Sequence, residues 1–148
     1  MSVFGVSIFQ DRDAMDLFEE ILNGGDLIGE IRTSCEIVID DFEDLTMYET
    51  CCIAVLGAEL VAASMGNISK HFPGPEFFDG EYTDGVKVAH PDWDEIADPS
   101  NKDLRLLAIN AIKTLLTSER CDYYLFWRDA KLFEEWEAEM NDLLDRLH

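Results

Sequence analysis

Basic side chains are scarce in this sequence. Its 148 residues include 11 Lys and Arg against 32 Asp and Glu, which gives a formal net charge of −21 at pH 7. Nucleic acids and anionic membranes are bound through clusters of Lys and Arg, so neither is expected as a direct partner. A compact domain with this much like charge repels itself. Either a cationic partner or a demand for solubility would account for the excess.

Long apolar runs and an export signal are also lacking. No run approaches the roughly 18–20 apolar residues that a membrane span needs, and residues 1–5 show no basic segment followed by an apolar one. The four cysteines have no C-x-x-C spacing, and without an export signal we expect them to be buried thiols. They are Cys35, Cys51, Cys52 and Cys121. These features favour a cytoplasmic location.

The apolar content is sufficient for a core, since 47% of the residues are hydrophobic and nine are Phe. The length fits one domain, and apolar residues recur mainly at helical spacing. We therefore predict a single compact, acidic, mostly α domain over residues 1–148, with about five to six helices. The expected helical segments are 11–22, 26–39 (where Ile37-Val38-Ile39 is β-prone), 46–65, 100–117, 119–128 and 131–147.

The segment over 46–65 is predicted to be the central, buried helix, because it contains few polar residues. Thr46-Met47-Tyr48-Glu49 has the pattern of a capping box at its start. Ala54, Ala58, Ala62 and Gly66 form a stripe of small residues that would let another helix approach closely. If that other helix belongs to a second copy, the protein is a structural or adaptor homodimer, and homo-oligomerisation is thus possible.

Residues 67–99 carry all four prolines and little periodicity. We predict one long irregular loop, with a possible short hairpin around 82–88. Such loops are commonly functional or mobile. Three phenylalanines in it, Phe72, Phe77 and Phe78, either pack onto the core, which is favoured, or stand out as anchors for a partner.

The charge is unevenly distributed. Residues 1–66 hold fourteen acids and two bases, whereas residues 100–148 hold ten acids and seven bases. The first half and the long loop are therefore the candidate surface for a cationic partner. The predicted partner-binding residues are the acidic stretch Asp40, Asp41, Glu43 and Asp44, the apolar anchor Tyr48, and the loop residues Phe77, Phe78, Asp79, Glu81 and Asp84.

The sequence contains no convincing catalytic or metal-binding pattern. The acids from Asp79 onward do not follow calcium-loop spacing, and the three histidines do not pair at i+3 or i+4. Nothing local supports a nucleophile formed by Cys51 or Cys52 with His71 or His90. We therefore predict no catalytic residue, no metal site and no cofactor. A small metal-dependent enzyme with acids from the first helix and the long loop remains an alternative.

The start of the chain resembles a known family. The residues that carry the resemblance are Gly5, Phe9, Asp13, Ala14, Asp16 and Leu17. Their pattern is similar to the start of bacterial proteins in domain-of-unknown-function family 4259, as are the Ala-rich central helix and the terminal helix with Trp136. The chain departs from the family at Phe4, where Trp is common, and at Asp11-Arg12, where Asn-Asp is common, so it resembles a divergent member. The resemblance implies no activity.

Charge, size and the lack of a catalytic pattern together favour a non-enzymatic acidic binding protein. Its most concrete form is a bacterial immunity-type inhibitor that neutralises a basic toxin, such as a nuclease effector. An acidic surface that meets a positively charged substrate groove gains steered association and excludes the anionic substrate. The expected partner is thus a basic protein.

Overall fold

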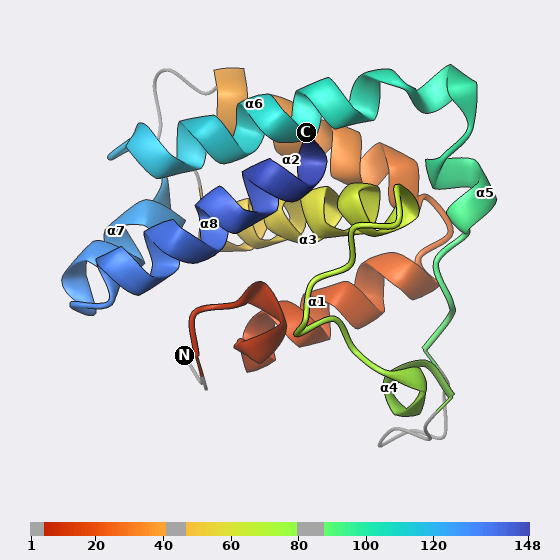
Figure 1. Cartoon of the computed structure of the whole chain (residues 1–148), viewed down its shortest axis with the longest axis horizontal. Coiled ribbons are helices and arrows are strands. Elements are labelled where there is room, and N and C mark those ends of the chain that lie inside the picture. The colour runs from red at the N-terminus through yellow and green to blue at the C-terminus, as the bar shows by residue number, and fades with distance from the viewer. Residues whose placement is uncertain (1–4, 41–46, 80–87) are drawn as a thin grey trace.

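A computed structural model of the chain describes residues 5–40, 47–79 and 88–148. Over these ranges the chain is mostly α-helical and has no β-sheet, as predicted (Figure 1). There are more helices than expected within the described residues. The α-helices are α1 (Arg12–Asn23), α2 (Leu27–Asp40), α3 (Tyr48–Ser64), α4 (Pro75–Asp79), α5 (Trp93–Ile96), α6 (Asp103–Thr117), α7 (Asp122–Asp129) and α8 (Phe133–Leu147). Short 3₁₀ turns, Ile8–Gln10 and Pro99–Asn101, precede α1 and α6.

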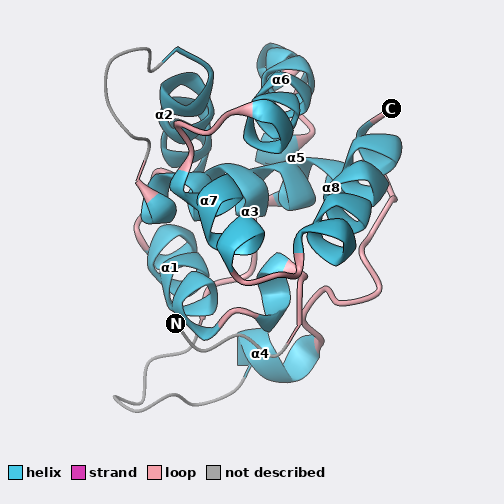
Figure 2. Ribbon diagram, turned by 90° about the vertical axis from the view of Figure 1, so that its left-hand side faces the viewer, coloured by secondary structure: helices cyan, strands magenta, loops and turns pink. Residues whose placement is uncertain are grey.

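Helix α3 is the centre of the fold, as its apolar sequence predicted. Every residue from Ala54 to Ala63 is buried, and α1, α2, α6, α7 and α8 all pack against this helix. Figure 2 shows α3 surrounded by α1, α2, α6 and α8, with α7 crossing in front of it. The position of α1 and α7 against the start of α3 is what shapes the candidate site described below.

The start of α1 is fixed by Asp11. This side chain is fully buried, and its Oδ1 accepts hydrogen bonds from the backbone N–H groups of Asp13 (3.0 Å) and Ala14 (3.2 Å). These bonds satisfy amide groups that the first helical turn leaves without partners. The preceding 3₁₀ turn has its own capping box, formed by Ser7 and Gln10.

The segment with the β-prone run Ile37-Val38-Ile39 is helical, because tertiary packing overrides local preference. Ile31, Cys35 and Val38 lie at helical spacing and are all completely buried. In α2 they share one face toward the core, which a strand with its two-residue period could not provide.

The small residues of α3 are used for packing within the chain. Ala54, Ala58 and Ala62 have no exposed surface, so they are not available to a second copy in this fold. Gly66 lies beyond the end of α3 and has a positive φ of 88°, which glycine adopts without strain. At the other end, Met47 precedes α3 and provides no side-chain cap. Thr46 of the predicted capping box lies outside the described residues.

The long connection is more ordered than predicted, since it contains α4 and α5. The hairpin predicted around 82–88 lies outside the described residues, apart from Val88. Phe77 stacks on the buried Phe18, with ring centroids 5.6 Å apart and an interplanar angle of 13°. Phe78 is only 6% exposed. The loop aromatics thus pack onto the core, and the prediction that Phe78 anchors a partner is wrong because its ring is buried.

The four cysteines are buried thiols, as predicted. None of the helices in the described ranges is both long enough and apolar enough to cross a membrane.

Candidate functional site

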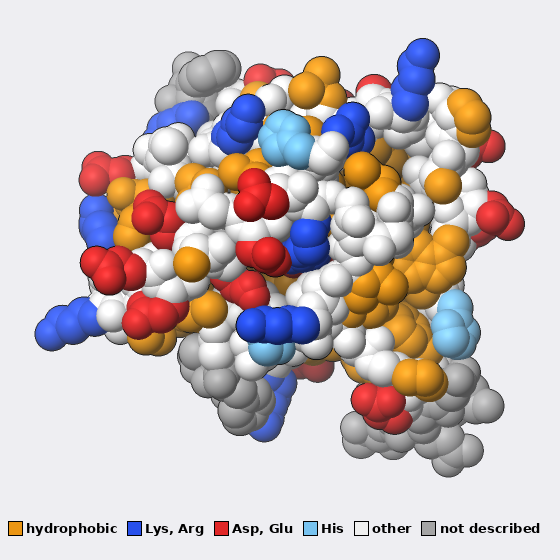
Figure 3. Space-filling model, viewed as in Figure 1, with side chains coloured by type: hydrophobic (Ala, Val, Ile, Leu, Met, Phe, Trp, Pro, Cys, Tyr) orange, Lys and Arg blue, Asp and Glu red, His pale blue; other side chains and the backbone are white. Residues whose placement is uncertain are grey.

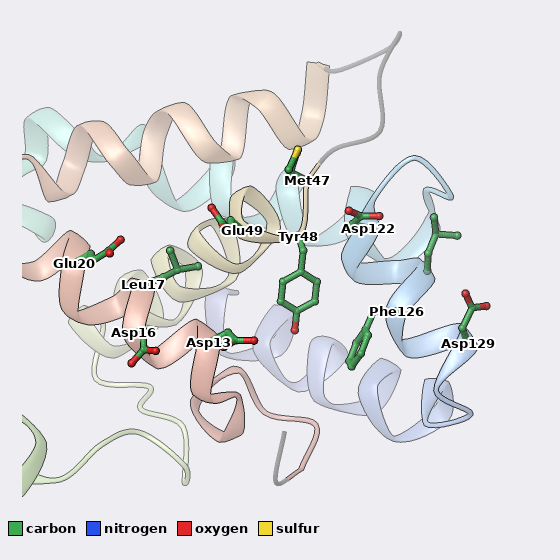
Figure 4. Close-up of a pocket in the computed structure, with 11 residues that line it drawn as sticks. Asp13, Asp16, Leu17, Glu20, Met47, Tyr48, Glu49, Asp122, Phe126 and Asp129 are labelled. Carbon is green, nitrogen blue, oxygen red and sulfur yellow. The ribbon is translucent and has the colours of Figure 1, made fainter. Parts of the chain in front are cut away.

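A groove opens between α1, the start of α3 and α7 (Figure 4). Its volume is about 750 Å³, within the range typical of ligand-binding clefts. We call it the acidic groove. It is lined by Asp13, Asp16, Leu17, Glu20, Met47, Tyr48, Glu49, Asp122, Leu125, Phe126 and Asp129.

Helix α1 supplies one side of the groove because it is strongly amphipathic. Its buried face, which includes Ala14 and Phe18, turns toward α3. The opposite face presents Asp13, Asp16 and Glu20 at positions i, i+3 and i+7, which align along one side of a helix. These three carboxylates are therefore held in a row by the helix itself.

The start of α3 and helix α7 supply the other carboxylates. Glu49 lies in the first turn of α3, and Asp122 lies in the first turn of α7. Asp129, at the end of α7, is in an exposed ion pair with its neighbour Arg128, with 3.4 Å between Oδ1 and Nε. Six of the eleven lining residues are acidic and none of the eleven is Lys or Arg. The groove thus concentrates negative charge.

The floor of the groove is apolar and aromatic. The rings of Tyr48 and Phe126 meet edge to face, with centroids 5.6 Å apart. Both are half-buried, and Figure 4 shows them between the carboxylates of α1 and those of α7. Met47, at the border, is 65% exposed. An occupant of the groove would therefore contact apolar surface as well as charge.

Beneath the floor, Tyr48 is held by a polar contact to the core. Its hydroxyl donates a hydrogen bond to Oδ2 of Asp11, the same residue that caps α1. Burial is the main cause that raises the pKa of the Tyr48 hydroxyl well above its ordinary value. The hydroxyl therefore stays protonated and fixes the ring. Tyr48 thus connects the groove to the start of α1.

The buried thiols near the groove do not have the properties of catalytic nucleophiles. Burial raises the pKa of Cys52 well above its ordinary value, and a hydrogen bond with Cys121 together with burial raises that of Cys51. Because the thiolate is the reactive form, these protonated thiols are poor nucleophiles. His71 lies against Glu139 of α8, and His90 stacks on Phe78, so neither histidine lines the groove.

No group of three or more His, Cys, Asp or Glu side chains within residues 5–40, 47–79 and 88–148 is arranged to hold a metal ion. The carboxylates of the groove surround its floor and do not converge on one point. Divalent cations need several oxygens around a common centre.

Among those predicted partner-binding residues that the structure describes, Tyr48 is the one that lines the acidic groove. Asp40 is the last residue of α2 and lies with Glu36 and Ile37 at a separate shallow hollow. Phe77 is half-buried, and Asp79 is the last residue of α4. The residues that lie outside the described ranges are Asp41, Glu43, Asp44, Glu81 and Asp84.

Sequence reasoning missed most of the groove. Of the residues that line the groove, it named Tyr48 as a partner-binding residue and assigned Glu49 to a capping box. A signal was present on α1, where Asp13, Asp16 and Glu20 follow a helical period. Nothing in the sequence paired that face with Asp122 and the rest of α7.

The C-terminal helices carry several ion pairs. Helix α8 holds six acids and one base, Arg146, and Figure 3 shows acidic side chains with fewer basic ones on this face of the molecule. Arg146 and Asp142 pair at 2.8 Å, and Arg128 and Glu119 pair at 3.2 Å. Ion pairs thus offset part of the negative charge of the C-terminal helices. Arg128, which also pairs with Asp129, offsets part of the charge at the α7 end of the acidic groove.

Comparison with known proteins gave a family match. The model of the family described as "Domain of unknown function (DUF4259)" matches residues 2–139 of the chain. No curated protein and no solved structure matches. The match covers α1, the start of α3 and α7, and therefore includes all elements of the acidic groove.

Proposed function

The chain belongs to the DUF4259 family, and we propose that it acts as a binding protein that takes up a basic protein partner in the acidic groove. The most specific form of this proposal is an immunity-type inhibitor of a basic bacterial toxin, such as a nuclease effector. In this role the protein performs no chemistry. It covers a positively charged surface that the toxin needs for its own substrate.

One observation carries the proposal: six carboxylates surround an apolar floor, and no Lys or Arg lines the groove. Complementary charge accelerates association and rejects anionic competitors. Burial of apolar and aromatic surface supplies affinity at the centre of an interface. The groove combines both properties, whereas exposed acids on a plain surface would provide only the first.

The net charge of the chain favours a basic protein as the partner. At −21 the chain repels nucleic acids, anionic membranes and further copies of itself. For the same reason, a nuclease whose substrate groove is positive is a suitable target. The acids of the inhibitor would occupy positions that phosphates occupy in the nucleic acid.

A capture experiment with matched variants tests the proposal. The tagged wild-type chain is compared with a groove variant, Asp16→Asn/Glu20→Gln/Asp129→Asn, and with a control variant, Glu134→Gln/Glu137→Gln/Asp145→Asn. Both sets are exposed acids, and both remove three charges, but the second lies on α8 outside the groove. Each chain is incubated with a lysate of its own organism, washed at low and then high salt, and the eluates are identified.

We expect a basic protein to bind the wild type and the control variant, to be released by salt, and to be lost with the groove variant. Co-expression should then show that the captured protein is toxic alone and harmless with the wild-type chain. Equal capture by the groove and control variants would contradict the proposal. If added divalent cations raised the melting temperature strongly instead, the metal-dependent enzyme would be favoured.

A further inference from the structure

We infer that the acidic groove receives an amphipathic α-helix of the partner, with an apolar stripe bordered by Lys and Arg at helical spacing. The inference rests on the proposed function, since it names the element by which the basic partner binds. The inference depends on the shape of the groove, its charge and its apolar floor together. A cluster of acids alone would not support it.

The carboxylates on α1 are spaced to meet a second helix. Asp13, Asp16 and Glu20 all line the groove at i, i+3 and i+7, and they span about 10 Å along the helix axis. A second helix beside α1 has the same rise per residue, so bases at i, i+3 or i+4, and i+7 would meet the carboxylates one by one. A strand repeats its side chains on one face at about 6.6 Å, which does not match the closer Asp13–Asp16 step.

The floor of the acidic groove offers apolar surface to an occupant. Leu17 lies on the same face of α1 as the acids, and the rings of Tyr48 and Phe126, which also line the groove, are half-buried. Met47 leaves 65% of its surface exposed at the border. A purely polar polycation would leave this apolar surface in water. A helix with an apolar stripe covers it, in the way that amphipathic helices bind hydrophobic grooves.

Other occupants match the acidic groove less well. A second copy of the chain would bring another surface of the same sign, because its net charge is also −21. A small polyamine would satisfy the carboxylates but would bury little of Phe126 or Leu125. The charge and the apolar surface of the groove thus both match one class of occupant, a basic amphipathic helix.

Synthetic peptides test this inference. The first is a fluorescently labelled peptide of Leu and Lys, with Leu at i, i+3, i+4 and i+7 and Lys on both sides of that stripe. The second has the same composition, rearranged so that Leu and Lys alternate and no helical stripe can form. Binding to the full chain is measured by fluorescence anisotropy at several salt concentrations, with spermine as a competitor.

We expect the first peptide to bind at least about tenfold more tightly than the second, a difference of about 1.4 kcal/mol. Asp16→Asn/Glu20→Gln should weaken its binding and reduce the salt dependence. Met47→Ser should weaken its binding without changing the salt dependence, and it should not perturb folding because Met47 is exposed. Glu134→Gln/Glu137→Gln on α8 should leave binding unchanged.

Equal binding of the two peptides would overturn the inference, and so would complete displacement by spermine at equal charge concentration. If a basic protein is captured through the groove but the first peptide has no advantage, the helical occupant is wrong while the proposed function stands. If capture does not depend on the groove and neither peptide binds there, both are wrong.

Discussion

Glu59 and Arg146 form a bidentate ion pair between the central helix and the C-terminal helix. The distances are 2.7 Å from Arg146 Nη1 to Glu59 Oε2 and 3.0 Å from Nη2 to Oε1. Glu59 is only 4% exposed, in the middle of α3. Arg146 also bonds to Asp142 through Nε at 2.8 Å. The pair therefore joins α8 to the centre of the fold.

Removal of one partner of this pair should destabilise the protein strongly. Arg146→Ala leaves the Glu59 carboxylate buried without its counter-charge, and we expect a loss of about 3–5 kcal/mol in the free energy of unfolding. Urea denaturation measures it. The matched double variant Glu59→Gln/Arg146→Met, which leaves no buried charge, should lose less than Arg146→Ala alone. A larger loss in the double variant would contradict this account.

The stability conferred by Glu59 should depend on pH. Burial raises the pKa of Glu59 above its ordinary value of 4.5, and the Arg146 guanidinium opposes this only in part. Between the unfolded and the folded pKa, the folded chain holds a proton that the unfolded chain has released. The contribution of Glu59 to the free energy of unfolding therefore falls as the pH rises through this window.

Comparison with Glu59→Gln isolates this effect, because Gln does not titrate. We expect the unfolding free energy of the wild type minus that of the variant to decrease from mildly acidic to neutral pH, as measured by denaturation at each pH. If this difference in unfolding free energy increased with pH instead, Arg146 would be holding the pKa of Glu59 below its ordinary value.

Tyr48→Phe should separate folding from binding. The substitution removes the hydrogen bond from the Tyr48 hydroxyl to the buried carboxylate of Asp11. We expect a loss of about 1–3 kcal/mol, measured by thermal or urea denaturation. The ring remains in the floor of the acidic groove, so partner binding should persist in chains that are folded. Tyr124→Phe, at a half-buried tyrosine outside the groove, is the control and should change stability less.

Gly57→Ala should disturb the contact between α2 and α3. A methyl group there would lie 2.6 Å from Cγ2 and 2.9 Å from Cγ1 of Ile31, well inside the roughly 3.5–4.0 Å of a normal carbon contact. Ile31 is completely buried and cannot turn away. Overpacking costs about 1–3 kcal/mol, against about 1 kcal/mol gained in helix propensity.

We therefore expect a net loss of stability for Gly57→Ala, measured by urea denaturation. In the double variant Gly57→Ala/Ile31→Ala the clash is relieved, so its loss should be smaller than the sum of the two single losses. Strict additivity would show that the two side chains do not compete for the same space.

Added salt should stabilise this protein. With a net charge of −21 the folded chain repels itself, and about 0.1 M salt screens charges separated by more than about 10 Å. The melting temperature should rise with sodium chloride. The variant Glu137→Lys/Asp145→Lys, which makes the net charge less negative by four, should show a smaller rise. An equal rise in both chains would attribute the effect to something other than net charge.

Much of the fold follows from the sequence because helical periodicity is a local property. The helical spacing of apolar residues predicted a helix over 11–22, where the structure has α1. The apolar run of α3 predicted its central position. Local signals were weaker for α4 and α5, where prolines and short length hide any period. Local signals also did not decide whether the β-prone end of α2 is a strand or a helix. The burial of Val38 and Cys35 on one face favours the helix.

The acidic groove depended on tertiary structure. A helical period tells which side chains of one helix face outward, but it does not tell which outward faces meet. Asp13 and Asp122 are far apart in the sequence, and they line one groove only because α1 and α7 both pack on the start of α3. By itself the sequence determined the excess of negative charge, the helices and the buried character of α3. Packing of the helices on α3 decided where that charge surrounds an apolar floor, because contacts between distant segments are not encoded in any local pattern.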